Sequence, residues 1–239
     1  MAQSFFIWNG IDCRSKGITM RGPAPIIRPE ERVKHVEIPG RSGDVTETEG
    51  ENIYNSYIQT VSITVRGSQN VRNIYKWLRG SGFVTFSGEP DKKQAARVIG
   101  AITLNRISRN MDKWQGEVQF YCQPLKQMLA EEKVTITSSG VSVRNGGDVI
   151  CKPMWKVTAG SGQTTIILTA GGNTIAVTGL ARGSVIWIDS DTMEVWNSAK
   201  TSLLTVNSTG DFPVLNPGAN TVTGSYWSSV EIEKRERYL

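Results

Sequence analysis

Apolar and polar residues alternate over short stretches in the first half of the chain. Residues 5–8 are apolar and run into Asn9-Gly10, and residues 58–65 alternate over part of their length. Alternation with a period of two indicates strands, and Asn-Gly favours a tight hairpin turn. The chain is therefore predicted to form β-structure from its first residues.

The period changes from two to about 3.6 near residue 70, which predicts an amphipathic helix over about 70–79. Ser68 or Asn70 is expected to cap its start, and Gly80 suits a left-handed end. The large side chains expected on the buried face are Val71, Ile74, Tyr75, Trp77 and Leu78.

Further strands are predicted at 82–87, 97–104 and 114–122, with a polar stretch over 91–96 before the second of them. Gln123-Pro124 is expected to end the last strand. Residues 125–132 contain good helix formers, so a short helical connector is predicted there.

The second half has a different pattern, with short strands separated by Gly, Asn and Asp about every ten residues. That spacing, without amphipathic helices, indicates an antiparallel β-sandwich. Turns are expected at 171–173 and 189–191. The predicted strands are 133–137, 154–158, 164–169, 173–178, 184–189, 192–196, 220–223 and 227–233.

The fold class is therefore mainly β. An N-terminal β-sandwich-like domain with one amphipathic helix is expected over 1–130, and a C-terminal antiparallel β-sandwich over 131–239. A total of 239 residues suits two domains of ordinary size.

Composition narrows the class of protein. Apolar residues form 38% and charged residues 21% of the chain, which excludes global disorder. No apolar run reaches the roughly 18 residues that a transmembrane helix needs, so no membrane association is expected. The first residues lack the basic and apolar regions of a secretion signal, which favours folding in a cytoplasm.

The net charge of +5 is unevenly distributed. Residues 1–126 hold 18 Lys and Arg against 12 Asp and Glu, whereas residues 127–239 hold 9 against 10. The basic residues of the first half are scattered among glutamates and form no run, so specific nucleic-acid recognition is not favoured.

Candidate catalytic and metal-binding groups are few. His35 is the single histidine. It is expected to be an ordinary strand residue, and the alternative is a hydrolase in which His35 is catalytic. Cys13, Cys122 and Cys151 form no C-x-x-C pair. Asp189, Asp191 and Glu194 lack calcium-loop spacing, and the glycine-rich segments at 144–148 and 160–162 lack the helix of a phosphate loop. No catalytic, metal or cofactor site is predicted.

The second half is rich in tryptophan, which a carbohydrate-binding β-sandwich could stack on sugar rings. Trp187 lies inside an apolar run, which instead points to core packing. The residues in question are Trp155, Trp187, Trp196 and Trp227.

Residues 39–57 are polar, rich in glycine and long for a connection inside a compact domain. Such segments often act outside their own domain, so an arm that contacts another subunit is expected, with a mobile loop as the alternative. The candidate arm residues are Pro39, Gly40, Arg41, Gly43, Asp44, Glu51, Tyr54 and Tyr57.

The order of short motifs resembles that of the siphophage distal tail protein (Dit) family over almost the whole chain. Each motif alone is an ordinary turn or strand sequence, and the order and spacing carry the resemblance. In the first half the motifs lie at 5–10, 17–18, 38–44, 74–80, 84–91 and 116–124, and in the second half at 145–147, 153, 186–189 and 212–220.

The resemblance implies a structural role without a cofactor. Dit proteins form a ring, usually a hexamer, at the distal end of the phage tail, with a ring-forming N-terminal domain and an outward galectin-like C-terminal domain. They join the tail tube protein to the tail-associated fibre or lysin protein, around a channel through which DNA passes as cargo. Some also anchor receptor-binding proteins. The alternative function is a carbohydrate-binding adhesin.

Overall fold

The computed structural model describes residues 4–48, 50, 52–108 and 110–239. The chain divides into two compact units, one reaching residue 129 together with residue 239, and the other spanning residues 130–238. Each unit has its own hydrophobic core. The fold is mainly β, which confirms the predicted class.

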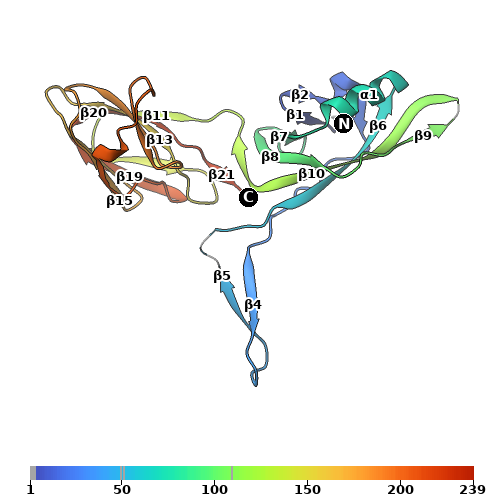
Figure 1. Ribbon diagram of the computed structural model, residues 1–239, viewed down its shortest axis with the longest axis horizontal. Coiled ribbons are helices and arrows are strands. Elements are labelled where there is room, and N and C mark those ends of the chain that lie inside the picture. The colour runs from blue at the N-terminus through green and yellow to red at the C-terminus, as the bar shows by residue number, and fades with distance from the viewer. Residues whose placement is uncertain (1–3, 49, 51, 109) are drawn as a thin grey trace. The chain divides into compact units, whose positions relative to one another are not determined.

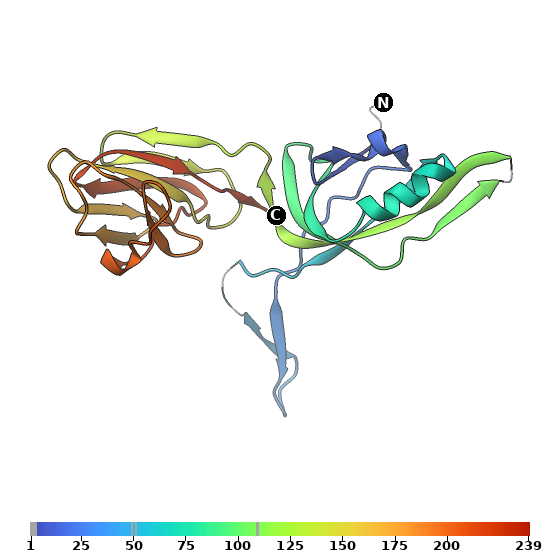
Figure 2. The same ribbon diagram turned by 45° about the horizontal axis from the view of Figure 1, so that its top comes forward.

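The first unit is built on one antiparallel sheet with the strand order β2-β1-β7-β8-β10-β6-β3 (Figures 1 and 2). A further strand, β9, pairs with β10 beside it. The strands are β1 (Phe6–Trp8), β2 (Ile11–Asp12), β3 (Ile18–Met20), β6 (Tyr57–Arg66), β7 (Ser81–Phe86), β8 (Lys92–Ile99), β9 (Leu104–Ser108) and β10 (Met111–Met128), and a 3₁₀ turn, η1 (Cys13–Lys16), lies between β2 and β3.

The turn between β1 and β2 follows directly from the sequence. Asn9 and Gly10 have φ angles of 50° and 78°, as a type I′ turn requires. Asn is one of the few residues with a side chain that tolerates this left-handed conformation, and Gly adopts it without strain. The predicted hairpin turn is therefore confirmed.

The helix α1 (Ser68–Trp77) begins and ends slightly before the expected range. The caps expected at the start, Ser68 or Asn70, are wrong: the N-cap is Gly67, and Asp112 Oδ2 accepts a hydrogen bond from Ser68 N at 2.9 Å. Asn70 donates to Arg66 O at 2.6 Å. The helix start is thus held by the sheet rather than by a local motif.

One face of the sheet packs against α1 and forms the core of the first unit (Figure 2). Ile74 and Leu78 are buried, and Val71 and Trp77 are partly buried against the same cluster. The indole ring of Trp77 stacks on Phe6, with ring centroids 5.9 Å apart. Tyr75, expected on the buried face, is 42% exposed, so that part of the prediction is wrong.

Two predictions for the first unit, one of a strand and one of a helical connector, are corrected by the structure. The strand expected at 97–104 runs from Lys92 to Ile99 as β8, and Leu104 begins β9. The helical connector expected at 125–132 is wrong, because β10 continues past Pro124 to Met128. A register shift between Cys122 and Lys126 accommodates Pro124, and pairing with β8 then resumes. Ladder pairing thus overrides helix propensity here.

A separate two-stranded ribbon, made of β4 (Val33–Glu37) and β5 (Asp44–Thr48), interrupts the sheet of the first unit between β3 and β6 (Figure 1). Val33 pairs with Thr48 at one end and Glu37 with Asp44 at the other. The predicted strand around His35 is confirmed, and the segment after it is a hairpin rather than an irregular connection.

The second unit is a sandwich of two five-stranded antiparallel sheets, as predicted, ordered β11-β20-β13-β16-β17 and β12-β19-β14-β15-β18. Their strands are β11 (Lys133–Ile136), β12 (Val141–Asn145), β13 (Met154–Ala159), β14 (Ile166–Ala170), β15 (Asn173–Val177), β16 (Val185–Asp189), β17 (Glu194–Asn197), β18 (Ser208–Gly210), β19 (Gly218–Ser225) and β20 (Trp227–Glu233), with a 3₁₀ turn, η2 (Thr205–Asn207), before β18 and a final short strand, β21 (Arg237–Tyr238).

The core of the second unit lies between the two sheets and is lined by alternate residues of their strands. Trp155 is fully buried in it. Trp187 is not, although core packing was expected, because it points away from the core between the buried Ile186 and Ile188. The β12 and β18 strands were missed: β18 has only three residues, and β12 ends at Asn145 inside the glycine-rich segment 144–148.

Candidate functional site

The hairpin of β4 and β5, called the arm below, is the most unusual part of the first unit. Its tip contains Pro39, Gly40, Arg41 and Gly43, and all four are exposed. Asp44 begins β5 and lies directly opposite Glu37, so two like charges face each other across the ribbon.

Burial in the arm is slight along its whole length. Among the described residues from Glu30 to Ile58 none is buried, and the best-covered side chains of the ribbon, those of Val33, Val36 and Val45, are only half-buried. An isolated two-stranded ribbon is marginally stable in water. The arm therefore contributes nothing to the core of its own unit and has a surface free for another molecule.

The base of the arm is fixed to the first unit by backbone pairing. Glu31 forms a β-bridge with Tyr54, and Arg32 N donates to Ile53 O at 2.8 Å. Of the candidate arm residues, Glu51 lies outside the described residues. The structure thus places the candidates Pro39, Gly40, Arg41, Gly43 and Asp44 in the ribbon, and Tyr54 at its base.

Tyr57 differs from the other candidates, because it begins β6 and belongs to a polar cluster inside the first unit. Its hydroxyl and the side-chain amide of Gln94 exchange hydrogen bonds of 3.1 and 2.9 Å. Burial raises the pKa of Tyr57 to about 12. Beside them Lys126, 5% exposed, donates to Glu89 Oε2 at 2.6 Å. This cluster holds the strand from which the arm returns.

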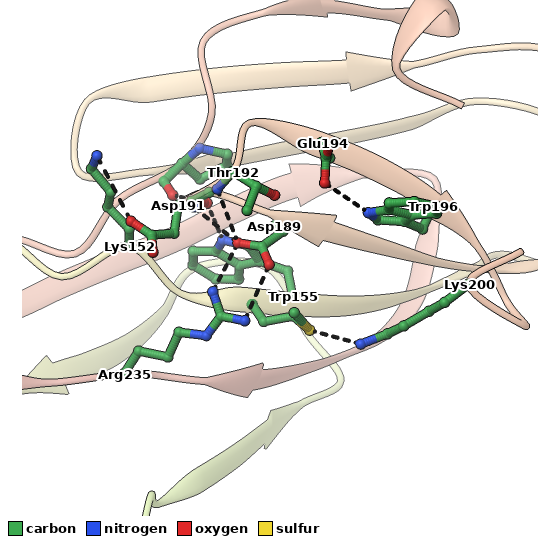
Figure 3. A network of polar contacts seen from close by, with 12 residues as sticks. Lys152, Trp155, Asp189, Asp191, Thr192, Glu194, Trp196, Lys200 and Arg235 are labelled. Carbon is green, nitrogen blue, oxygen red and sulfur yellow. Dashed lines mark hydrogen bonds and ion pairs between the residues drawn. The ribbon is translucent and has the colours of Figure 1, made fainter. Parts of the chain in front are cut away.

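The second unit contains a network of polar contacts around the turn between β16 and β17 (Figure 3). Asp189 Oδ1 accepts from Arg235 Nη1 at 2.8 Å and from Asp191 N at 3.0 Å. Burial acts to raise the pKa of Asp189, but the hydrogen bonds from Arg235 and from the turn outweigh it and lower that pKa. Trp155 Nε1 donates to Ser190 Oγ at 3.0 Å. Every group in this network has a partner, which indicates a structural role.

Two tryptophans lie opposite each other on the outer face of β16 and β17, Trp187 and Trp196. This pair is the feature that could suit a sugar ring. However, Lys200 Nζ lies 4.0 Å from the Trp187 ring centroid, and Trp187 Nε1 donates to Ser198 O at 3.2 Å. One ring face and the indole nitrogen are therefore already engaged.

The described residues show no arrangement for the other chemistries considered. No group of three or more His, Cys, Asp and Glu in that part of the chain could hold a metal ion. His35 is exposed on the arm, and its described side-chain contact is with Thr46 Oγ1 at 3.4 Å. The three cysteines are buried and unpaired. None of the helices in the described ranges has the length and hydrophobicity for crossing a bilayer.

Comparison with solved structures identifies the same architecture in a phage protein. The crystal structure of SPP1 Dit (gp 19.1), described as a paradigm of the hub adsorption apparatus in phages that infect Gram-positive bacteria, matches with a TM-score of 0.80 and 17% identity over 100% of both chains. A chain of the phage p2 baseplate in its activated, Sr-bound conformation matches over 98% of both chains with 9% identity and a TM-score of 0.47, too low to carry an argument.

Sequence comparisons give no further relative. No family model matches the chain. No curated protein matches it either. At 17% identity only three-dimensional structure relates the chain to SPP1 Dit, and the resemblance suggested by motif order is confirmed at that level. The chain has the fold of the phage SPP1 Dit protein over its entire length.

Proposed function

We propose that this protein is a structural subunit of a phage tail tip, where it forms a ring, usually hexameric in Dit proteins, around the channel for DNA. The observation that carries the proposal is the match to SPP1 Dit over both units, with a TM-score of 0.80. Dit proteins join the tail tube protein to the tail-associated fibre or lysin protein, and these are the partners proposed. The virion tail is the proposed location.

The distribution of surfaces supports a division of roles between the two units. The first unit has the arm, whose described residues are half-buried or exposed, and the excess of positive charge. The second unit is a closed sandwich with its own core. We therefore assign ring contacts to the first unit and an outward position, open to receptor-binding proteins, to the second.

The arm is the proposed contact between subunits. A ribbon that is marginally stable alone gains stability when a neighbour covers it, and a head-to-tail contact repeated around an axis closes a ring. A contact with a neighbouring subunit would also explain why two apolar residues, Val36 and Val45, lie opposite each other on a ribbon outside the core of its own unit.

Assembly can be tested with the full chain by light scattering and negative-stain electron microscopy, alone and with the tail tube and downstream tail proteins. Rings with a central hole are expected. Monomers at every concentration, with both partners present, would exclude the proposal.

The alternative, an adhesin that binds carbohydrate through the second unit, rests on the Trp187 and Trp196 pair. Glycan binding would raise the melting temperature of the parent protein and fail to raise that of Trp196→Ala. Because Lys200 covers Trp187, no glycan-dependent shift is expected. No enzymatic activity is proposed for the chain.

A further inference from the structure

Part of the outer edge of β6, in the sheet of the first unit, has no paired strand among the described residues. The pairing of β3 with β6 ends at Met20 and Ile63, followed by one bond from Arg21 N to Ser62 O at 3.0 Å. Pairing along this edge resumes only at the base of the arm, where Asn55 N donates to Glu30 O at 2.7 Å. Between these two points β6 has an open edge.

The backbone groups at this edge can be identified from strand geometry. Successive residues of a strand direct their N–H and C=O groups to opposite sides. Because Ser62 O faces β3, the N–H and C=O groups of Ile58 and Thr60 face the same edge. These groups have no hydrogen-bonding partner among the residues that the structure describes. Ile58 is 50% exposed, so the edge is accessible.

The segment that follows β3 does not continue along the edge of β6. It leaves a cavity beside that edge, called the slot below. A cavity of about 490 Å³ lies between residues 20–25 and residues 60–62. Pro23 and Pro25 form part of its wall and have no N–H to donate. The segment therefore cannot continue the ladder, and the slot stays open to an extended strand, which needs about 4.8 Å of width in the sheet.

The arm of another copy has the properties of a strand that fits this slot. Its β5 pairs with β4 on one side and has a free edge on the other. Val45, Thr46 and Thr48 are β-branched, which suits them to a sheet. Unpaired strand edges are templates for pairing with another chain.

Charge favours β5 of the arm over β9, a strand of the first unit's sheet that, of the strands described, pairs only with β10. Arg21 is the one charged residue among the described residues that line the slot. β5 contains Asp44 and Glu47, whereas β9 contains Arg106 and no acid. A carboxylate near Arg21 is attracted, and a second arginine would be repelled.

We infer that the open edge of β6 is a strand-addition site that receives β5 of a neighbouring copy, so that the sheet continues from one subunit into the next. This inference rests on the proposed ring-forming function. It adds the surface that receives the arm and the means of recognition, which is backbone pairing across the slot at Ile58 and Thr60.

The first test is Thr60→Pro, with Thr60→Val as its matched control. Proline removes an N–H group that makes no bond within the subunit, and places a ring where an added strand would lie. The variant should melt within a few degrees of the parent and assemble about tenfold more weakly, as expected for one or two lost backbone hydrogen bonds. Thr60→Val should assemble like the parent.

The second test is cysteine cross-linking between copies, which remains informative if Thr60→Pro does not fold. Gly22 lies at the slot with open space around it, and the native cysteines are buried. An oxidised mixture of Gly22→Cys and Thr46→Cys should give a disulfide between copies. A mixture of Gly22→Cys and Asn105→Cys, on β9, should give none.

The outcomes separate the two proposals. If the parent forms no rings, the proposed function fails and the strand addition with it. If rings form but Thr60→Pro assembles like the parent and Gly22→Cys does not link to Thr46→Cys, only the strand addition is overturned. A link from Gly22→Cys to Asn105→Cys would likewise overturn it by making β9 the occupant.

Discussion

Asp189 and Arg235 form a bidentate ion pair in the second unit, with Oδ1 2.8 Å from Nη1 and Oδ2 3.1 Å from Nη2 (Figure 3). Their side chains are 10% and 18% exposed. The pair joins the end of β16 to the segment that follows β20. Removing one partner of such a covered pair leaves the other charge poorly solvated.

Asp189→Asn is therefore expected to lower the free energy of unfolding of the second unit by about 3 kcal/mol. Chemical denaturation monitored by tryptophan fluorescence measures this. The matched control is Asp191→Asn, because the Asp191 side chain is 53% exposed and 3.9 Å from Lys152 Nζ. The control should change stability by less than about 0.5 kcal/mol, and equal losses in the two variants would contradict the role given to Asp189.

The same ion pair gives a pH dependence. The pKa of Asp189 in the folded protein lies below its usual value of 3.8. Its stabilisation is thus fully present above about pH 4 and is lost as the pH falls through the lower folded-state value. The stability difference between the parent and Asp189→Asn should shrink below pH 4. A difference that stays constant down to pH 2 would show that the ionised carboxylate is not what stabilises the fold.

Trp77→Ala is expected to destabilise the first unit by about 3 kcal/mol, because the indole packs on the core and stacks on Phe6. Tyr75→Ala, on the exposed side of the same helix, is the control and should cost less than about 1 kcal/mol, mostly through helix packing at the surface. Thermal unfolding by circular dichroism compares the two. Similar melting temperatures for both variants would mean that the buried face of α1 is misassigned.

Shortening the arm should weaken assembly without unfolding either unit. His35 and Thr46 are opposite each other, so residues 36–45 can be replaced by Asn-Gly to close a two-residue hairpin turn. None of the removed residues is buried. Size-exclusion chromatography should show loss of the ring and circular dichroism an unchanged melting temperature. An unchanged oligomer would reduce the arm to a passive ribbon.

The thiols should resist modification while the protein is folded. Burial raises the pKa values of Cys122 and Cys151 to about 12, and it also raises that of Cys13. At pH 8 the folded protein should react with a thiol reagent only slowly, and three thiols should react rapidly once the chain is unfolded in urea. Fast reaction of one thiol in the folded state would show local opening around it.

The sequence determined those parts of the fold that depend on neighbouring residues. Asn9-Gly10 specifies a left-handed turn between two strands. Gly171-Gly172 does the same between β14 and β15, where Gly171 also lies so close to Val214 O that a side chain would collide with it. The period of hydrophobic residues located most strands and the single helix, because burial of one face requires that period.

The tertiary structure determined those parts of the fold in which contacts between residues distant in sequence outweigh local preferences. Leu125 to Met128 are good helix formers but form a strand, because β8 offers a ladder for them. Trp187 lies in an apolar run but faces outward, because its flanking isoleucines occupy the core. The arm and the open edge of β6 likewise depend on which strand pairs with which over long separations. Local sequence does not specify such pairings, since each strand could pair with many others of similar pattern.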